Sequence, residues 1–524
     1  MIVDTIKVVQ EASRLAIKEL EGICLEEVPR LGITKTHTDL LGSHTVVTYP
    51  PLDALREINS DLLFSEIQFQ NRIDAYMHIP FCEYPCKFCP YTTIGVRGKD
   101  GERIPGYIDA LKTEVTTWAK KLNEQGAQVR SLYVGGGTPF AIPEEDLEDI
   151  ISFTKRTLPF VDLSEICVET SPRATLQEEA KKKLEMLKRL GVTRMSIGIQ
   201  SFDFESLKDM ARTFQGHTPE DEERAVRTLL NSGIPNVNVD MIQDLPIKSR
   251  EYLERLQHDL LKIAQLRPQH VTWYNLRLRP ETTYARQKEG RVKLVTEEES
   301  LHTRLTIWNF MESIGYVVLE GDRFALAESY EDRFRKTRGS VTTDLLGMGV
   351  SAYSHVQPGF FQNTREIGSN VRADSQRAIE KYMKQVREKG HAITYGFPLT
   401  PDELLAGKLA LGLKKGVSHE ELHEALTYAR ECGAYNDIIL QQSHELIEAG
   451  LLEVRDGRIQ FTRKGRLFEN EICARFYSPR VIHAAHERRG TLTPEITSQY
   501  EQYRGRQELD QIAAEQRPPF IYLS

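Results

Sequence analysis

The stretch "YMHIPFCEYPCKFCPYTT", residues 76–93, places three of the chain's seven cysteines within eight positions, at Cys82, Cys86 and Cys89. Three prolines interrupt the same stretch. Because proline fixes φ and has no backbone N–H, the stretch is predicted to form a loop rather than a helix. A loop constrained in this way can wrap three sulfur atoms around one compact centre.

Three thiolates suit an iron–sulfur centre with one open position. An ordinary [4Fe–4S] cluster takes four cysteine thiolates. The next cysteine is the distant Cys167, which lies inside a predicted strand and is better explained as a small buried side chain. Three ligands would leave one iron free to bind and activate another molecule. Two other interpretations stay open: a Cys3His zinc site that includes His78, or simply buried thiols.

The whole chain has the composition of a globular protein. Its 524 residues, 40% hydrophobic and 27% charged, are enough for roughly two to four domains. The net charge of −8 argues against a nucleic-acid partner held by bulk electrostatics. No stretch approaches the roughly 18 apolar residues of a membrane span, and the N-terminus lacks the apolar core of a signal peptide. We therefore expect a cytoplasmic protein with neither a nucleic-acid partner nor a membrane attachment.

Beyond residue 70, short apolar runs rich in β-branched and aromatic residues alternate with longer amphipathic ones. Buried strands that alternate with helices predict a parallel sheet. Six such units are too few to close an eight-stranded barrel, so the expected fold class is α/β, with a partial (β/α)6 barrel of the TIM type. The predicted strands are residues 73–79, 131–137, 165–170, 194–200, 237–242 and 270–276.

Polar residues and glycines gather at the ends of these predicted strands, and the cysteine loop follows the first one. In barrels of parallel strands, active-site residues lie at the carboxyl ends of the strands. These positions are therefore expected to meet at one rim. The other strand ends carry Gly135, Gly136 and Gly137, then Glu169, Gln200, Asp240 and Tyr274.

The regions outside the barrel have patterns of their own. After residue 400, three helical patterns precede a hairpin with an Asp456-Gly457 turn, which together predict a winged-helix-like α+β domain. The last 40 or so residues are polar and weakly patterned and are expected to form a tail. The expected segments are an N-terminal extension (1–70), the partial barrel (71–290), a barrel-completing region (291–395), the winged-helix-like domain (396–480) and the tail (481–524).

The spacing C-x3-C-x2-C, with Phe88 before the third cysteine, resembles the signature of the radical S-adenosylmethionine (SAM) enzymes. "YMHIPFC" directly before it resembles one branch, which contains the oxygen-independent coproporphyrinogen III oxidases, related haem chaperones, and radical methyltransferases and cyclopropane-forming enzymes. The resemblance covers about residues 72–480. It is carried further by "YVGGGTP" (133–139), "EICVETSPR" (165–173), "RMSIGIQSF" (194–202), "NVDMIQDLP" (238–246), "LLGMGVSAYS" (345–354) and "LLEVRDGRIQFTRKGRLFENEI" (451–472).

This resemblance implies a radical SAM barrel and a [4Fe–4S] cluster held by Cys82, Cys86 and Cys89, whose open iron chelates SAM. Reductive cleavage of SAM would give a 5′-deoxyadenosyl radical, which removes a hydrogen atom from the substrate. Tyr76 and His217 are the catalytic residues expected from it. The cofactor contacts that it implies are Tyr76, Gly135, Gly136, Gly137, Thr138, Glu169, Gln200, Arg212 and Asp240.

The residue types suit these roles. The glycines let the backbone approach the methionine part of SAM, Glu169 can hold its amine, and Arg212 can pair with its carboxylate. Gln200 and Asp240 can take the ribose hydroxyls. Plainer interpretations exist for each: the glycines could form an ordinary turn, and the carboxylates could be helix caps or members of surface ion pairs. His217 could reach the substrate or cap the following helix.

Within the branch, the chain most resembles the group that uses two SAM molecules for radical C-methylation or methylene transfer (cyclopropanation) on a small-molecule substrate. Coproporphyrinogen III oxidases typically carry a fourth cysteine where this chain has Tyr91, and the haem chaperones lack extensions such as 1–70 and 481–524. Oxidative decarboxylation of coproporphyrinogen III and non-catalytic haem binding are the alternatives. The resemblance also implies that this chain needs a reducing partner such as flavodoxin or ferredoxin.

Overall fold

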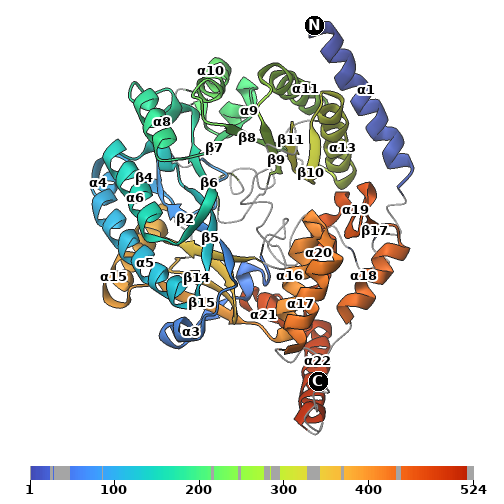
Figure 1. Ribbon diagram of the computed structural model, residues 1–524. Coiled ribbons are helices and arrows are strands. Elements are labelled where there is room, and N and C mark those ends of the chain that lie inside the picture. The colour runs from blue at the N-terminus through green and yellow to red at the C-terminus, as the bar shows by residue number, and fades with distance from the viewer. Residues whose placement is uncertain are drawn as a thin grey trace.

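One large sheet runs through the computed structural model, and Figure 1 shows its strands as an incomplete ring with helices on the outer side. The sheet has thirteen strands among the described residues. The ring leaves an inner face on which the carboxyl ends of the parallel strands can meet. The structure describes residues 2–23, 28, 33, 48–84, 86–213, 217–245, 249–276, 282, 284, 295–326, 343–366, 371–431 and 438–515.

All six predicted strands are present and lie side by side in chain order, each parallel to the next. This arrangement confirms the predicted α/β fold class. Because successive side chains of a strand point to opposite faces, Ala75 and Met77 join the main core while Tyr76 lies on the inner face. The strands are β2 (Arg72–Ile79), β5 (Gln128–Gly136), β6 (Phe160–Thr170), β7 (Arg194–Gln200), β8 (Asn236–Gln243) and β9 (His270–Asn275).

Amphipathic helices connect these strands and cover the outside of the ring (Figure 1). Local signals fix where they begin and end. Thr218 and Asp221 form a capping box at the start of one helix, and Gly126, with φ of 68°, ends another in the left-handed conformation. The helices are α5 (Ile104–Gln125), α6 (Glu144–Thr157), α8 (Ala180–Arg189), α10 (Pro219–Leu230) and α11 (Ser249–Leu266), with shorter η2 (Pro139–Ala141), α7 (Pro172–Thr175) and α9 (Phe204–Asp209).

Strands from the region 291–395 extend the sheet at both ends. β12 (Asp344–Met348) lies parallel to β2, and β11 (Arg323–Ala325) lies antiparallel to β9. The sequence predicted only a barrel-completing region here, without its strands, because these strands are short and lack the regular alternation of the first six. The other elements are β10 (Val317–Glu320), β13 (Tyr353–Val356), β14 (Gly359–Asn363), β15 (Ile393–Pro398), β1 (Arg56–Glu57), α13 (Glu297–Ser313) and α15 (Val371–Lys389).

The N-terminal extension packs onto this body. Helix α1 (Ile2–Glu21) lies beside α13 (Figure 1), and Ser13 Oγ is 3.1 Å from His302 Nε2. Further along, η1 (Leu52–Ala54) and α3 (Ser60–Glu66) precede the barrel. The Tyr49 hydroxyl donates to the carbonyl of Phe476, which ties the extension to the C-terminal part of the chain.

The C-terminal region contains the predicted helices and hairpin. Asp456 and Gly457 have φ of 51° and 71°, as the predicted two-residue turn requires. β16 (Val417–Ser418) pairs with the second hairpin strand and completes a three-stranded sheet. The other elements are α16 (Pro401–Gly412), η5 (Leu413–Lys415), α17 (His419–Glu431), α18 (Ile438–Glu448), β17 (Leu452–Arg455), β18 (Arg458–Phe461), α19 (Arg463–Leu467) and α20 (Glu469–Ala474).

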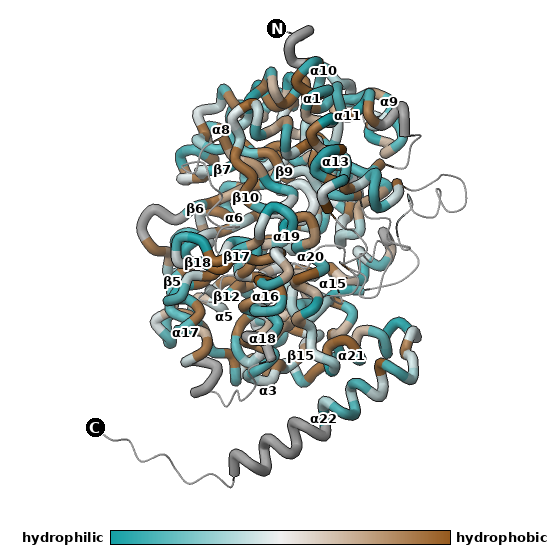
Figure 2. The backbone as a smooth tube through the Cα atoms, turned by 90° about the vertical axis from the view of Figure 1, so that its right-hand side faces the viewer, coloured by the Kyte–Doolittle hydropathy of each residue, from teal (hydrophilic) through white to brown (hydrophobic). Residues whose placement is uncertain are grey.

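Much of the expected C-terminal tail (481–524) is helical. Residues there form α21 (Pro479–Arg489) and α22 (Pro494–Glu515), and Figure 2 shows α22 leaving the body of the molecule. Ser478 caps the first helix and Gly490 ends it, so capping signals were present in a polar sequence. No helix in the described part of the chain is both long and apolar enough to cross a membrane.

Candidate active site

The cysteine loop follows β2 and is fixed by its own short ladder. β3 (Phe81–Cys82) pairs with β4 (Ile94–Gly95). The N–H of Val96 donates to the carbonyl of Cys82 over 3.1 Å, and the N–H of Cys89 donates to the carbonyl of Cys86 over 3.0 Å. The predicted loop is therefore a closed and hydrogen-bonded structure at the rim of the barrel.

Two of the three cysteine thiols have raised pKa values. Burial, and then the neighbouring Cys86, raises the pKa of Cys82 to about 11, and the same two causes raise that of Cys89. Within the described ranges, no three His, Cys, Asp or Glu side chains converge as a single metal ion requires. Each cysteine of a [4Fe–4S] cluster binds a different iron, so its sulfurs do not need to converge on one point. The loop therefore fits a cluster better than a single ion.

His78 is not available as a fourth ligand. Its Nε2 lies 3.1 Å from the carbonyl of Thr92, which can only accept, so Nε2 carries the proton. Its Nδ1 then accepts from the Tyr76 hydroxyl over 3.0 Å. Burial lowers the pKa of His78 to about 4, which keeps the ring neutral. Both ring nitrogens have partners, which argues against the zinc interpretation.

Glu169 lies at the end of β6 beside the glycines of β5. Its carboxylate accepts from the Tyr133 hydroxyl over 2.8 Å and from the N–H of Gly136 over 3.0 Å. Its charge also contributes to the raised pKa of Cys89, so it lies close to the cysteine loop. An anchored carboxylate at this point is suited to hold an ammonium group.

The three glycines allow close packing of this corner. A Cβ on Gly135 would lie 2.9 Å from the Glu169 carboxylate, and one on Gly136 would lie 2.6 Å from the His78 ring. A Cβ on Gly137 would lie 2.4 Å from the carbonyl oxygen of Phe81. Thr138 follows, with Oγ1 3.3 Å from the Sγ of Cys82. The motif therefore brings three strand ends together around the first cysteine.

Arg212 reaches the cysteine loop from the segment after β7. Its Nη1 donates to the Sγ of Cys86 over 3.4 Å, and its Nη2 donates to the carbonyl of Gly198 over 2.7 Å. The buried carboxylate of Glu222 lies 3.7 Å from Nη2 and 3.3 Å from Nδ1 of His217. The side chains of Arg212, His217 and Glu222 are nearly inaccessible to solvent. Arg212 is thus a positioned cation, whereas His217 is a buried partner of Glu222, and its catalytic role stays a prediction.

Gln200 and Asp240 occupy the next two strand ends. Gln200 has φ of 74°, a left-handed conformation that is costly for a side chain other than glycine, and it lies where the β7–β8 register shifts. Asp240 accepts from Ser196 Oγ over 2.9 Å and from Asn238 Nδ2 over 2.8 Å. Both side chains are half-buried, so they remain able to contact a ligand on the inner face.

The inner face next to these residues is aromatic. Tyr76 and Tyr133 stack with ring centroids 6.2 Å apart, and Tyr353 packs against the same cluster with Leu345 and the fully buried Cys167. The burial of Cys167 confirms its interpretation as a small core side chain. Sequence reasoning missed Tyr133 and Tyr353. The two tyrosines lie on strands far apart in the sequence. They share one face only because of how these strands pair in the sheet, which one sequence does not reveal.

The "LLGMGVSAYS" motif packs against the end of β2 and against the cysteine loop. Gly349 has φ of 96°, and a Cβ there would lie 2.5 Å from the carbonyl of His78. Ser351, with φ of 59°, places its Oγ 2.7 Å from Thr92 Oγ1, just beyond the third cysteine. The glycine at 349 therefore serves close packing against His78.

Several known proteins resemble the chain. Residues 76–260 match the family model of the Radical SAM superfamily. Heme chaperone HemW from Bacillus subtilis (strain 168) is 26% identical over 404 residues, covering 77% of this chain and 98% of the relative. The oxygen-independent coproporphyrinogen III oxidase of Salmonella typhimurium is 28% identical over 426 residues, covering 77% and 85%. The solved structure of coproporphyrinogen III oxidase (HemN) from Escherichia coli aligns with a TM-score of 0.65 at 24% identity, over 82% of this chain and 96% of that one.

These relationships confirm the expected resemblance, the barrel fold and the implied cofactors, a [4Fe–4S] cluster and SAM. They do not support the predicted methyl or methylene transfer, because the related proteins are coproporphyrinogen III oxidases and haem chaperones. The first residues of "GVSAYSH" (349–355) pack against His78 and Thr92.

Proposed function

We propose that this chain, which carries a radical SAM domain, is an oxygen-independent enzyme that oxidatively decarboxylates two propionate side chains of coproporphyrinogen III. The observation that carries the proposal is the gathering of Glu169, Arg212 and the three-cysteine loop at one rim of parallel strands, next to a wall of tyrosines. When bound and reduced by one electron, the cluster and SAM supply a carbon radical that removes an unactivated hydrogen atom.

In this proposal the chain's own residues orient the reactants. Cys82, Cys86 and Cys89 hold the cluster, and the anchored carboxylate of Glu169 holds the amine of SAM. Arg212 pairs with the SAM carboxylate, because a guanidinium matches the two oxygens of a carboxylate. Gly135, Gly136, Gly137 and Thr138 shape the corner, and Gln200 and Asp240 take the ribose hydroxyls.

We assign Tyr76 to the binding of the substrate. Its hydroxyl lies 3.0 Å from Nδ1 of His78, which fixes the ring on the inner face. Together with Tyr133 and Tyr353 it forms an aromatic wall, which suits a ligand built from pyrrole rings. Conversion of each propionate into a vinyl group releases CO2 and removes one hydrogen atom and one electron, so an electron acceptor completes the reaction.

A haem chaperone is the second candidate, and two observations favour it. The HemW relative is matched over 98% of its length. Tyr91, which is 62% exposed, also stands where the oxidases typically carry a fourth cysteine. A chaperone would bind haem in a fixed ratio to protein and would not convert coproporphyrinogen III.

One anaerobic experiment distinguishes a decarboxylating enzyme from a haem chaperone. The reconstituted protein is incubated with SAM, dithionite, an electron acceptor and coproporphyrinogen III, and porphyrins and 5′-deoxyadenosine are measured by mass spectrometry. The proposal predicts protoporphyrinogen IX together with 5′-deoxyadenosine, both reduced at least tenfold in Glu169→Gln and unchanged in the exposed control Glu185→Gln. Haem binding in a one-to-one ratio without decarboxylation would favour the chaperone.

A further inference from the structure

A chain of side-chain hydrogen bonds on the inner face of the barrel ends at Asp240. Thr272 Oγ1 donates to Asn238 Oδ1 over 3.0 Å, and Asn238 Nδ2 donates to Ser196 Oγ over 2.8 Å. Ser196 Oγ donates to Asp240 Oδ2 over 2.9 Å, and Asn238 Nδ2 also donates to Asp240 Oδ1 over 2.8 Å. Both oxygens of one carboxylate are therefore held by a set of three residues, called here the Asn238 network: Ser196, Asn238 and Thr272.

Three neighbouring parallel strands supply this network. Its members lie on β7, β8 and β9, which Figure 1 shows side by side in the ring. Ser196 pairs in register with Asn238, and Thr272 pairs in register with Asp240. Because side chains alternate between the two faces of a strand, Asn238 and Asp240 point to the same face. The register of the sheet therefore brings the four side chains together.

Each group of the network has a defined direction of donation. Its three side chains are only 2–3% exposed, whereas Asp240 is half-buried. An ionised carboxylate only accepts, so the amide nitrogen of Asn238 faces Asp240 and the amide oxygen faces the hydroxyl of Thr272. A buried network in which every donor has an acceptor holds its members in one arrangement. The orientation of the Asp240 carboxylate is thus set by residues that solvent does not reach.

The oriented carboxylate lies beside the other residues assigned to SAM, and Gly198 is where they meet. Gly198 pairs in register with Asp240, and its carbonyl accepts from Arg212. A Cβ on Gly198 would lie 2.8 Å from Gln200 Nε2, so the Gln200 side chain folds over this glycine. A carboxylate can accept from two adjacent hydroxyls only when its plane is turned toward both. A fixed carboxylate next to Gln200 is therefore suited to the two hydroxyls of a ribose.

We propose that the Asn238 network orients Asp240 for the ribose hydroxyls of SAM and so makes the site select a ribonucleoside over a deoxyribonucleoside. The inference rests on the proposed function, in which Asp240 takes those hydroxyls. The members of the network are positioning residues, because they act through the Asp240 carboxylate. A carboxylate that is already ordered loses little freedom when the ligand binds. A site built to bond a hydroxyl also rejects an analogue without it, because a buried polar group is then left unpaired.

Selection for ribose can be measured by binding alone. The probes are SAM and its 2′-deoxyribose analogue, each measured by equilibrium dialysis with the reconstituted protein in the absence of substrate and reductant. Ser196→Ala removes a donor to Asp240, and Thr272→Val removes a donor that does not touch Asp240. Thr272→Ser keeps that hydroxyl. Ser131→Ala is the matched control, because Ser131 is equally buried on β5 and donates over 2.6 Å to Asp74, a carboxylate with no assigned role.

We expect the unmodified protein to bind SAM about tenfold or more tighter than the 2′-deoxy analogue, as for a hydrogen bond to a charged group. Ser196→Ala and Thr272→Val should lower this ratio roughly threefold or more by weakening the binding of SAM, and Thr272→Ser and Ser131→Ala should preserve it. An unchanged ratio in Ser196→Ala and Thr272→Val, including an equal loss of affinity for both ligands, would overturn the proposal.

Asp240→Asn distinguishes a failure of this proposal from a failure of the assigned SAM contacts. If Asp240→Asn leaves the ratio unchanged, Asp240 does not take the ribose hydroxyls, and the network has no carboxylate to orient for them. If Asp240→Asn lowers the ratio while Ser196→Ala and Thr272→Val do not, Asp240 binds the ribose without help from the network. Both results would overturn the proposal, and a lowered ratio in all three variants would support it.

Discussion

The guanidinium of Arg212 donates a hydrogen bond to the Sγ of Cys86 over 3.4 Å. The cation that we assign to the SAM carboxylate therefore also touches the cysteine loop. The buried carboxylate of Glu222 lies 3.7 Å behind it and fixes its direction. Burial alone would lower the pKa of Arg212, but Cys86 and Glu222 raise it, so the side chain remains charged.

Replacing Arg212 by Lys should weaken SAM binding at least tenfold. Lysine keeps the charge but loses the planar fork that can contact Cys86, the Gly198 carbonyl and a carboxylate together. SAM affinity can be measured by equilibrium dialysis of the reconstituted protein. Arg227→Lys is the matched control, because Arg227 is 53% exposed on α10 and paired with Glu223. If the Arg212 variant and the control bound SAM with equal affinity, Arg212 would not be part of the SAM-binding site.

Glu169→Gln should destabilise the native state and weaken SAM binding. The amide has one acceptor oxygen where the carboxylate accepts from both Tyr133 and Gly136, so one buried donor would lose its partner. An unsatisfied buried group costs about 1–3 kcal/mol. Urea unfolding measures the loss of stability, and dialysis measures SAM binding. Glu185→Gln, on an exposed position of α8, should change neither quantity.

Gly136→Ala should cost more stability than Gly126→Ala. Both glycines have positive φ, at 116° and 68°, so both substitutions strain the backbone. The new Cβ would meet nothing within 4 Å at Gly126 but would lie 2.6 Å from the His78 ring at Gly136. We expect a loss of about 1 kcal/mol at Gly126 from the left-handed backbone conformation alone. Urea unfolding that shows equal losses would mean that the ring of His78 is not held as the structure shows.

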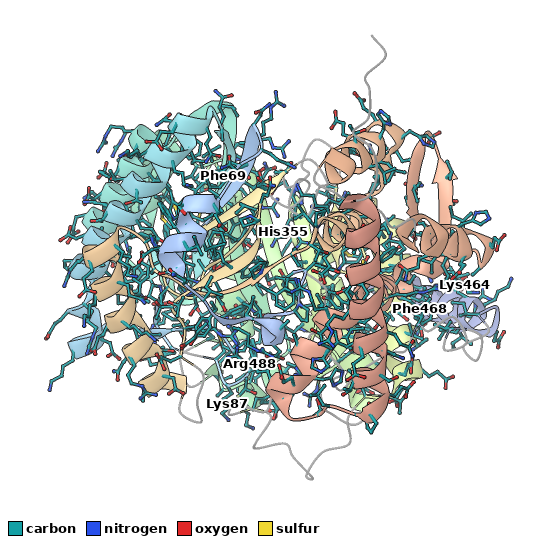
Figure 3. The ribbon with its side chains drawn as sticks, turned by 90° about the horizontal axis from the view of Figure 1, so that it is seen from below. Phe69, Lys87, His355, Lys464, Phe468 and Arg488 are labelled. Carbon is teal, nitrogen blue, oxygen red and sulfur yellow. The ribbon has the colours of Figure 1, made fainter. Side chains whose placement is uncertain are left out.

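Buried His355 on β13 makes stability depend on pH. It is labelled in Figure 3, and among the described residues its Nε2 has no hydrogen-bond partner. Burial, with a contribution from the nearby Lys408, lowers the pKa of His355 to about 3. The folded pKa lies below the unfolded value of about 6.5, so its effect is absent above pH 6.5 and stability falls as the pH drops.

Between pH 7.5 and 5.5 the His355 effect should amount to about 1.4 kcal/mol, the cost of one pKa unit. Urea unfolding at the two pH values should therefore show a smaller pH dependence in His355→Gln than in the unmodified protein. His444→Gln is the control, because His444 is 72% exposed on α18. An unchanged pH dependence in His355→Gln would show that this histidine takes up its proton in the folded state.

The barrel and its rim were predictable from the sequence because their signals are local. Each of the six strands is a short, mostly apolar run, and each places a polar residue or glycine at its end. The support of the site was not predictable. Tyr353, Ser351 and Glu222 are far from the cysteines in sequence, and only the folded sheet brings them to the loop. The predicted methyl or methylene transfer is not supported by the relatives, because the rim residues indicate binding of SAM and not the reaction that follows.

The central claim is that the loop of Cys82, Cys86 and Cys89 holds a [4Fe–4S] cluster whose open iron binds SAM. Electron paramagnetic resonance of the anaerobically reconstituted, dithionite-reduced protein, recorded with and without SAM, tests it most directly. We predict one reduced [4Fe–4S] signal per chain that changes when SAM is added and is absent when the three cysteines are replaced by alanine. A cluster signal that SAM leaves unchanged, or one that survives these replacements, would contradict the claim.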